Sequence, residues 1–243
     1  MKVRLVNASE LKNEMRVAGF MASVSYDSKG DQMKIAEHCA KSGHGTPFRA
    51  SRFIFEVSEV SRVLSHELVR HEIGLAKVQR SQRYVNEDGF KYTTPNSLNG
   101  VKVYVDELRT EITFEDLQSI VEQFYNGAVA QGVRNEDARY ALTNATHTKL
   151  HLSFDLEALE QFCYRRCCTR AQWEIRELAN AIKQLVVQEL PVLEPLLGAP
   201  CHVHGYCPEA NGCGIAPSKE EFIALYKVGK AENEKLLKAK EME

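Results

Sequence analysis

Hydrophobic residues recur at intervals of three and four positions over most of the chain, which predicts amphipathic helices. The clearest case places Ile175, Leu178, Ile182, Leu185 and Val186 on one helical face. The helices predicted in this way cover residues 10–22, 31–41, 60–70, 114–131, 136–145, 156–167 and 170–190.

Strict alternation of apolar and polar residues is confined to short segments, which predict strands. Phe53, Phe55 and Val57 alternate with polar neighbours, residues 3–6 read VRLV, and residues 101–105 read VKVYV in a turn-rich region. Strands and helices do not alternate in a βαβ rhythm, and no GxGxxG or GxxxxGK[ST] loop occurs. The predicted fold class is therefore α+β, rich in helices with a small antiparallel sheet.

Two regions of different composition divide the chain. Residues 1–217 are expected to form one catalytic domain. Residues 218–243 are expected to form a charged helix that docks on this domain through Phe222, Leu225 and Tyr226.

The predicted helix at 60–70 has Val60, Val63, Leu64 and Leu68 facing inward. Three polar residues at positions i, i+3 and i+4 then form one stripe at its C-terminal end: Glu67, Arg70 and His71.

Cationic and hydrogen-bonding groups mark both ends of the segment RHEIGLAKVQRSQRY, at residues 70–84. Guanidinium groups bind phosphate oxygens in pairs, so Arg70, His71, Ser81 and Arg83 predict a nucleotide phosphate site. In an extended SQRY segment Ser81 and Arg83 face the same side, where a hydroxyl and a guanidinium side by side suit a phosphate or a pyrimidine edge. A helix end with scattered solvated charges is the alternative.

Composition and charge limit the classes of partner. The 243 residues are 44% hydrophobic and 26% charged, and the net charge of −2 disfavours a polymeric nucleic acid. No apolar run reaches the length that spans a membrane, and no secretory signal is visible at the start. A cytoplasmic protein is expected.

Seven cysteines are present, an odd number that indicates reduced thiols. The segment CHVHGYCPEANGC brings Cys201, Cys207 and Cys213 close to two histidines, but its C-x5-C-x5-C spacing differs from that of zinc knuckles. A loop with incidental thiols is preferred to a structural metal site, so no metal ligand is assigned.

Arg166 lies on a predominantly apolar helical face with Leu156, Leu159 and Cys163. A guanidinium that points inward needs an anionic or carbonyl partner. That partner is a ligand, or else Glu174 or Glu177 in a structural ion pair. Since no Ser-His-Asp order or HExxH motif is present, a bound cofactor is expected to carry the chemistry.

The motifs HGTPF, RH followed by SxRY, a helical arginine, and AQWEIR occur in this order between residues 35 and 190. This combination resembles the flavin-dependent thymidylate synthases (ThyX). The resemblance implies a homotetramer with shared active sites that hold FAD. It also implies methylation of dUMP to dTMP, with methylenetetrahydrofolate as carbon donor and NADPH as reductant.

The resemblance also implies roles for individual residues. Arg166 corresponds to the catalytic arginine that assists ionisation of the pyrimidine N3. The implied substrate-binding residues are Glu67, Arg70, Gln79, Arg80, Ser81, Gln82, Arg83, Arg139 and Arg166. The implied cofactor-binding residues are His44, Thr46, Arg70, His71, Glu72, Gln79, Asp155, Glu157 and Gln161.

Several residues depart from the family pattern. Glu72 replaces an arginine, Arg49 stands where a glutamate is common, and Asp155 and Glu157 replace an asparagine and an arginine expected beside FAD. These changes are open to three interpretations: a re-routed charge network, a different nucleotide, or a weakened flavin site. The alternatives to dUMP methylation are therefore methylation of another pyrimidine nucleotide, such as UMP, and nucleotide binding without catalysis.

Overall fold

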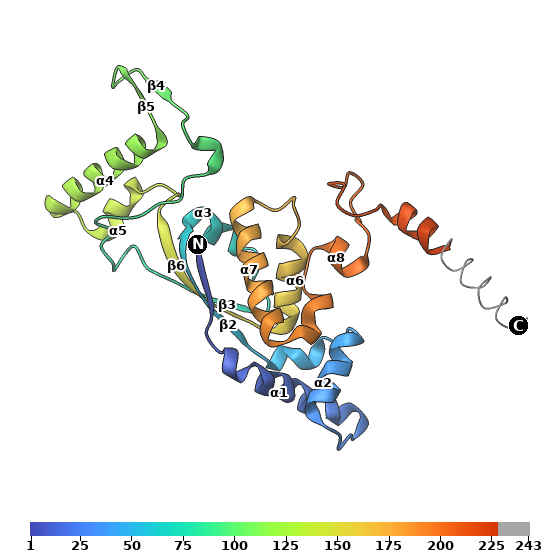
Figure 1. Ribbon diagram of the computed structural model, residues 1–243. Helices are drawn as coiled ribbons and strands as arrows, with labels where there is room; N and C mark the ends of the chain where they lie inside the picture. Colours follow the sequence, from blue (N-terminus) through green and yellow to red (C-terminus); the bar gives the residue numbers. More distant parts are fainter. Residues whose placement is uncertain (228–243) are drawn as a thin grey trace, which may run out of the picture. The chain divides into compact units, whose positions relative to one another are not determined.

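The computed structural model describes residues 1–227, apart from the side chain of Tyr26, and its elements are shown in Figure 1. The chain divides into two compact units. Unit 1 contains Met1–Glu14 and Phe48–Ala158, and unit 2 contains Met15–Pro47 with the chain from Leu159 onward. Each unit therefore combines segments that are distant in the sequence.

Unit 1 contains an antiparallel sheet of four strands in the order β1-β2-β6-β3. The strands are β1 (Lys2–Leu5), β2 (Phe53–Ser61), β6 (His147–Phe154) and β3 (Leu75–Gln79). This sheet, together with the helices, confirms the predicted α+β class.

The inner strands β2 and β6 bury every second side chain. Phe53, Phe55 and Val57 on β2 are buried, and Phe53 is directly opposite Phe154 of β6. The rings of Phe55 and Phe154 meet edge to face, with their centroids 6.0 Å apart. Apolar burial on this face of the sheet is a main stabilising contribution in unit 1.

The other elements of unit 1 are mostly helices, and the β4–β5 hairpin confirms the predicted strand near residues 101–105. A capping box of Thr113 and Asp116 begins the long helix α4. The elements are η1 (Ala8–Glu10), α3 (Arg62–Leu68), η4 (Asn96–Leu98), β4 (Val103–Val105), β5 (Thr110–Ile112), α4 (Phe114–Ala130), α5 (Asn135–Ala138) and η5 (Arg139–Ala141).

Unit 2 is helical. Helices α1 (Leu11–Ser23), α6 (Leu156–Arg166) and the short η3 (Thr46–Ala50) each cross the boundary between the units, and α7 buries Ile175, Leu178 and Ile182 as predicted. The remaining elements are η2 (Val24–Tyr26), α2 (Gln32–Lys41), α7 (Trp173–Glu189), η6 (Pro191–Leu196) and α8 (Pro200–His204).

The predicted C-terminal helix is described only in part, because residues 228–243 lie outside the described residues. Residues 219–227 are helical. Phe222 packs against Tyr206, with ring centroids 5.6 Å apart, whereas Leu225 and Tyr226 are exposed. A separate domain boundary at residue 217 stays a prediction.

Four local predictions were wrong. Helix α3 ends at Leu68, before Arg70, and Val63 is exposed rather than inward. The helix expected over 136–145 is shorter: α5 ends at Ala138 and η5 at Ala141, since Leu142 has an extended backbone. The segment after Ser81 is a turn rather than extended, since the Val85 N–H donates to the Ser81 carbonyl at 3.1 Å.

None of the helices within residues 1–227 is long and apolar enough to cross a membrane.

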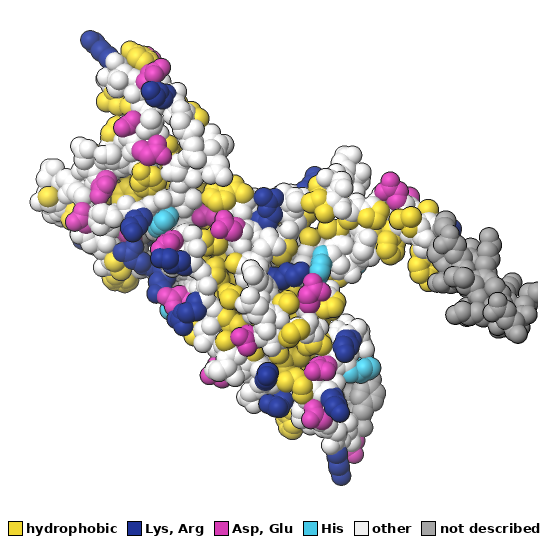
Figure 2. All heavy atoms as spheres, viewed as in Figure 1, with side chains coloured by type: hydrophobic (Ala, Val, Ile, Leu, Met, Phe, Trp, Pro, Cys, Tyr) yellow, Lys and Arg dark blue, Asp and Glu magenta, His cyan; other side chains and the backbone are white. Residues whose placement is uncertain are grey.

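A three-strand ion-pair network crosses the sheet of unit 1. The Glu56 carboxylate on β2 pairs with Arg4 on β1 and Lys149 on β6. Figure 2 shows basic and acidic side chains side by side on the molecular surface. Hydrogen bonds from Lys149 and Arg4 lower the pKa of Glu56 from its ordinary 4.5 to about 2.

The Glu56→Gln variant should lose acid-dependent stabilisation. A carboxyl whose pKa is lower in the folded state stabilises the fold fully above its unfolded pKa, and this stabilisation is lost as pH falls through the folded pKa. The free energy of unfolding of the variant, measured with urea, should therefore fall less steeply from pH 5 to pH 2. Glu111→Gln, an exposed change on β5, is the control. Equal slopes for all three proteins would contradict this role of Glu56.

Candidate functional site

Two of the predicted phosphate-binding arginines meet around Glu136 in unit 1. Arg83 Nε lies 2.7 Å from Glu136 Oε2, and Arg139 Nε donates to the Glu136 carbonyl oxygen at 3.1 Å. Helix α5 ends at Ala138, so the change to η5 places Arg139 one turn after Glu136. Two guanidinium groups are thus held at one residue, Arg83 by the carboxylate of Glu136 and Arg139 by its backbone carbonyl.

Arg70 follows α3 in a segment that Lys77 fixes from β3. The Lys77 ammonium donates to the carbonyl oxygens of Leu68 at 3.0 Å and His71 at 2.6 Å. These bonds satisfy carbonyls at the helix C-terminus, where a cation is favourable. Arg70 is exposed, and its guanidinium has no ion pair within the described residues.

Other residues of the same predicted site are held by internal contacts. Gln79 Nε2 donates to Ser65 Oγ at 3.1 Å and to Thr148 Oγ1 at 3.2 Å, which ties β3 to α3 and β6. Arg80 Nη1 lies 2.7 Å from Glu87, which is 3% exposed. Burial raises the pKa of Glu87, and Arg80 opposes that shift. Both residues therefore have a clear structural role.

The first three residues of the turn after Arg80 have different surroundings. Ser81 Oγ accepts the Arg83 N–H at 3.2 Å, which stabilises the turn. Gln82 is buried, and its Nε2 has no hydrogen-bond partner among the described residues. An unpaired buried donor is costly, so a ligand carbonyl or phosphate oxygen would relieve it. Arg83 is exposed.

Asp155 connects strand β6 to helix α6. Its carboxylate accepts the Ala158 N–H at 2.8 Å, as a helix cap does, and its own N–H donates to Gly74 O at 2.9 Å. A Cβ at Gly74, where φ is +73°, would lie 2.4 Å from the Asp155 carboxylate. This local packing explains why an aspartate and a glycine stand here.

Two departures from the family pattern meet in one ion pair. Arg49 Nη2 lies 3.1 Å from Glu157 Oε1, and Arg49 Nε bonds the other carboxylate oxygen. This bond lowers the pKa of Glu157 and raises that of Arg49. The family pattern has a glutamate at position 49 and an arginine at position 157, so the two charges are exchanged in this chain. Because the exchanged pair still has opposite charges, it supports the interpretation of a re-routed charge network.

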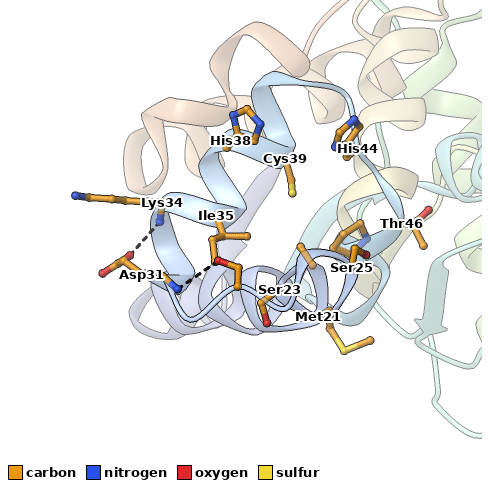
Figure 3. A pocket seen from close by; sticks show the side chains of 14 residues that line it. Met21, Ser23, Ser25, Asp31, Lys34, Ile35, His38, Cys39, His44 and Thr46 are labelled. Atoms are coloured by element: carbon orange, nitrogen blue, oxygen red, sulfur yellow. Dashed lines mark hydrogen bonds between the residues drawn. The ribbon is translucent and has the colours of Figure 1, made fainter.

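A cavity of about 810 Å³ lies between α1 and α2 in unit 2 (Figure 3). His44 and Thr46, two predicted flavin positions, line it. Its size falls within the range of about 300–1,000 Å³ that is typical of ligand sites.

Further polar groups line this cavity, although the sequence analysis did not assign them to a site. The Ser25 hydroxyl, the Lys34 side chain and His38 could bind ribose or diphosphate oxygens. Asp31 accepts the Lys34 N–H at 3.0 Å and caps α2, which lowers the pKa of Asp31. The helical spacing of Lys34 and His38 was the available signal, since both lie on one face of α2. A donor set of this kind fits a dinucleotide cofactor.

The remaining predicted residues lie on α6, on α3 or in the segment after α3. Arg166 is half-buried at the end of α6, and Gln161 is exposed on the same helix in unit 2. Glu67 is half-buried on α3, and Glu72 is exposed after it in unit 1. Within residues 1–227, no three His, Cys, Asp or Glu side chains are arranged to hold a metal ion.

Comparison with known proteins agrees with the motifs. A family model described as "Thymidylate synthase complementing protein" matches residues 4–192. A protein of Nitratidesulfovibrio vulgaris named flavin-dependent thymidylate synthase is 36% identical over 189 residues, covering 75% of this chain and 76% of the relative. A Clostridium tetani protein of the same name is 37% identical over 194 residues, covering 74% and 76%.

An archaeal relative extends the similarity. The Pyrococcus abyssi protein of that name is 33% identical over 195 residues, covering 75% of this chain and 77% of the relative. The chain therefore belongs to the family of flavin-dependent thymidylate synthases, as its motifs predicted.

Gly19 is expected to be essential for the packing of α1 against the start of α2. A Cβ at Gly19 would lie 1.8 Å from the Gln32 carbonyl oxygen, so Gly19→Ala should lower the free energy of unfolding by about 1–3 kcal/mol. The control is Gly127→Ala in α4, where a Cβ would meet no atom within 4 Å. This variant should gain about 0.5–1 kcal/mol because alanine favours helix. Urea unfolding measures both changes, and equal effects would contradict the close packing at Gly19.

Proposed function

We propose that this protein is a flavin-dependent thymidylate synthase that methylates dUMP to dTMP. The observation that carries the proposal is the meeting of Arg83 and Arg139 at Glu136, in a chain that belongs to this family. A phosphate monoester suits this arrangement because it offers several oxygens to guanidinium donors.

Glu136 holds Arg83 and Arg134 in place. Its carboxylate pairs with Arg83 at 2.7 Å and with Arg134 at 2.6 Å. The nucleotide phosphate takes over the Arg83 contact, with Arg70 as a further donor. The side chains are thus ordered before the substrate arrives, which reduces the cost of positioning it.

The cavity of unit 2 would hold part of the FAD, with His44, Thr46 and Lys34 as its polar contacts. When bound, the flavin supplies the redox and one-carbon transfer chemistry, with NADPH as reductant and methylenetetrahydrofolate as carbon donor. The protein acts in the cytoplasm as a homotetramer with active sites shared between subunits.

Arg166 stabilises the pyrimidine as it loses the N3 proton. A fixed cation beside a developing anion lowers the barrier most where water is excluded. Arg166 is half-buried, and buried Phe162 and Cys163 precede it on α6, so its surroundings are partly apolar.

The spectrum and activity of the purified protein test this function. We expect flavin absorbance in the purified protein, and dTMP formation from dUMP only when methylenetetrahydrofolate and NADPH are both present. UMP should not be methylated at a comparable rate. Methylation of UMP in place of dUMP would assign another nucleotide, and a colourless protein that binds dUMP without turnover would assign a binding protein.

Arg83→Ala should weaken dUMP binding by about 1.5–3 kcal/mol, because it removes a charged hydrogen bond to the phosphate. Flavin content should stay unchanged. Arg134→Ala is the matched control, since Arg134 pairs with the same Glu136 but belongs to no predicted contact with the nucleotide. Titration of dUMP into each flavin-loaded variant measures the effect. Equal losses in the two variants would place Arg83 outside the phosphate site.

A further inference from the structure

Five of the seven cysteines line one small cavity in unit 2, apart from the cavity assigned to the flavin. Its volume is about 190 Å³, and its cysteines are Cys167, Cys168, Cys201, Cys207 and Cys213. They come from the end of α6, from α8 and from the loop after α8. Since the volume lies below the range for drug-sized ligands, the cavity suits a very small one.

The loop that carries Cys207 and Cys213 is fixed at several points. The Cys207 N–H donates to the Pro217 carbonyl at 2.8 Å and closes the base of the loop. Glu209 pairs with Arg170 at 2.8 Å. These contacts hold the loop against the chain that follows α6, so its thiols have a defined position.

Cys207 lies beside the residue that precedes Cys213. Its Sγ is 3.1 Å from the place that a Cβ on Gly212 would occupy, and its own Cβ is 3.5 Å from it. Gly212 therefore leaves space for this thiol one residue away from Cys213. This proximity makes Cys207 and Cys213 a candidate pair of reacting thiols.

The two thiols differ in access and acidity. Cys213 is exposed, whereas Cys207 is half-buried. Hydrogen bonds from the Thr169 hydroxyl and the Ile215 N–H lower the pKa of Cys213. A thiol with a lowered pKa has a larger thiolate fraction at neutral pH, and the thiolate is the nucleophile.

We propose that this cavity is a thiol–disulfide exchange site for a small organic disulfide, with Cys213 as the attacking thiol and Cys207 as the resolving thiol. The Cys213 thiolate attacks one sulfur of the disulfide, forms a mixed disulfide and releases one small thiolate. The Cys207 thiolate then attacks Cys213 Sγ and releases the second. The two cysteines lose two protons and two electrons, and the small disulfide is reduced to two thiols.

Cys167 is the rival nucleophile in the same cavity. A hydrogen bond from the Cys163 thiol lowers the pKa of Cys167, while that bond and complete burial raise the pKa of Cys163. Cys167 is only half-buried and has this inaccessible thiol as its neighbour. The better exposure of Cys213 favours it as the first site of reaction.

The reaction of the full chain with 2-hydroxyethyl disulfide at pH 7, followed by acid quenching, intact mass and peptide mapping, tests the proposal. The unaltered protein should lose two free thiols without retaining an adduct, and the map should contain a Cys207–Cys213 disulfide. Cys207→Ser should retain one adduct, on Cys213. The Cys213→Ser variant should react at least about tenfold more slowly, because only thiols of ordinary reactivity remain.

Cys201→Ser is the matched control, because it removes a thiol from the same cavity outside the pair, and it should behave as the unaltered protein does. Peptide mapping of the unaltered protein gives a result even where a variant fails to fold. An adduct on Cys167, or one spread evenly over the five cysteines, would overturn the proposal. So would a zinc ion that copurifies and protects the thiols until a chelator removes it, which would assign a metal site.

Discussion

Strand β6 is the element on which unit 1 depends, because it pairs with β2 on one side and with β3 on the other. Its buried side chains fix the register, since a shift by one residue would turn Leu150 and Leu152 to the other face. The register in turn places Gln79 of β3 beside Thr148. At the end of β6, Asp155 begins α6, the helix that carries Arg166.

The helices and the class of fold could be predicted from the sequence, whereas strands β3 and β6 of the sheet were not predicted. Residues 173–189 and 114–130 form long helices because their apolar residues recur with a clear helical period. Strand β3 reads LAKVQ and buries only Leu75 fully, so it carries almost no alternation. Strand β6 does alternate, but it lies between helical segments, and its period of two was missed in residues 147–154.

The residue types of the candidate site could be predicted from the sequence, but the ion-pair partner and the burial of each residue could not. Arg80 and Arg83 lie three positions apart in the sequence, and both are equally plausible phosphate ligands from the sequence alone. The structure separates them, since Arg80 pairs with the buried Glu87 and Arg83 with the more accessible Glu136. Such a distinction depends on partners 7 and 53 residues away, which local patterns do not report. The pairing of Arg49 with Glu157, 108 residues apart, is hidden from sequence for the same reason.

The carboxylate of Glu136 also affects which anions can bind at the proposed phosphate site, because it competes with them for the guanidinium groups. An incoming anion competes with a carboxylate that already lies 2.7 Å from Arg83 Nε and also pairs with Arg134. Chloride and simple carboxylates carry one charge and gain little from this exchange. A phosphate monoester, with nearly two charges and three oxygens, gains more from the guanidinium groups. The internal ion pair would thus discriminate against the abundant monovalent anions of the cell without any steric barrier.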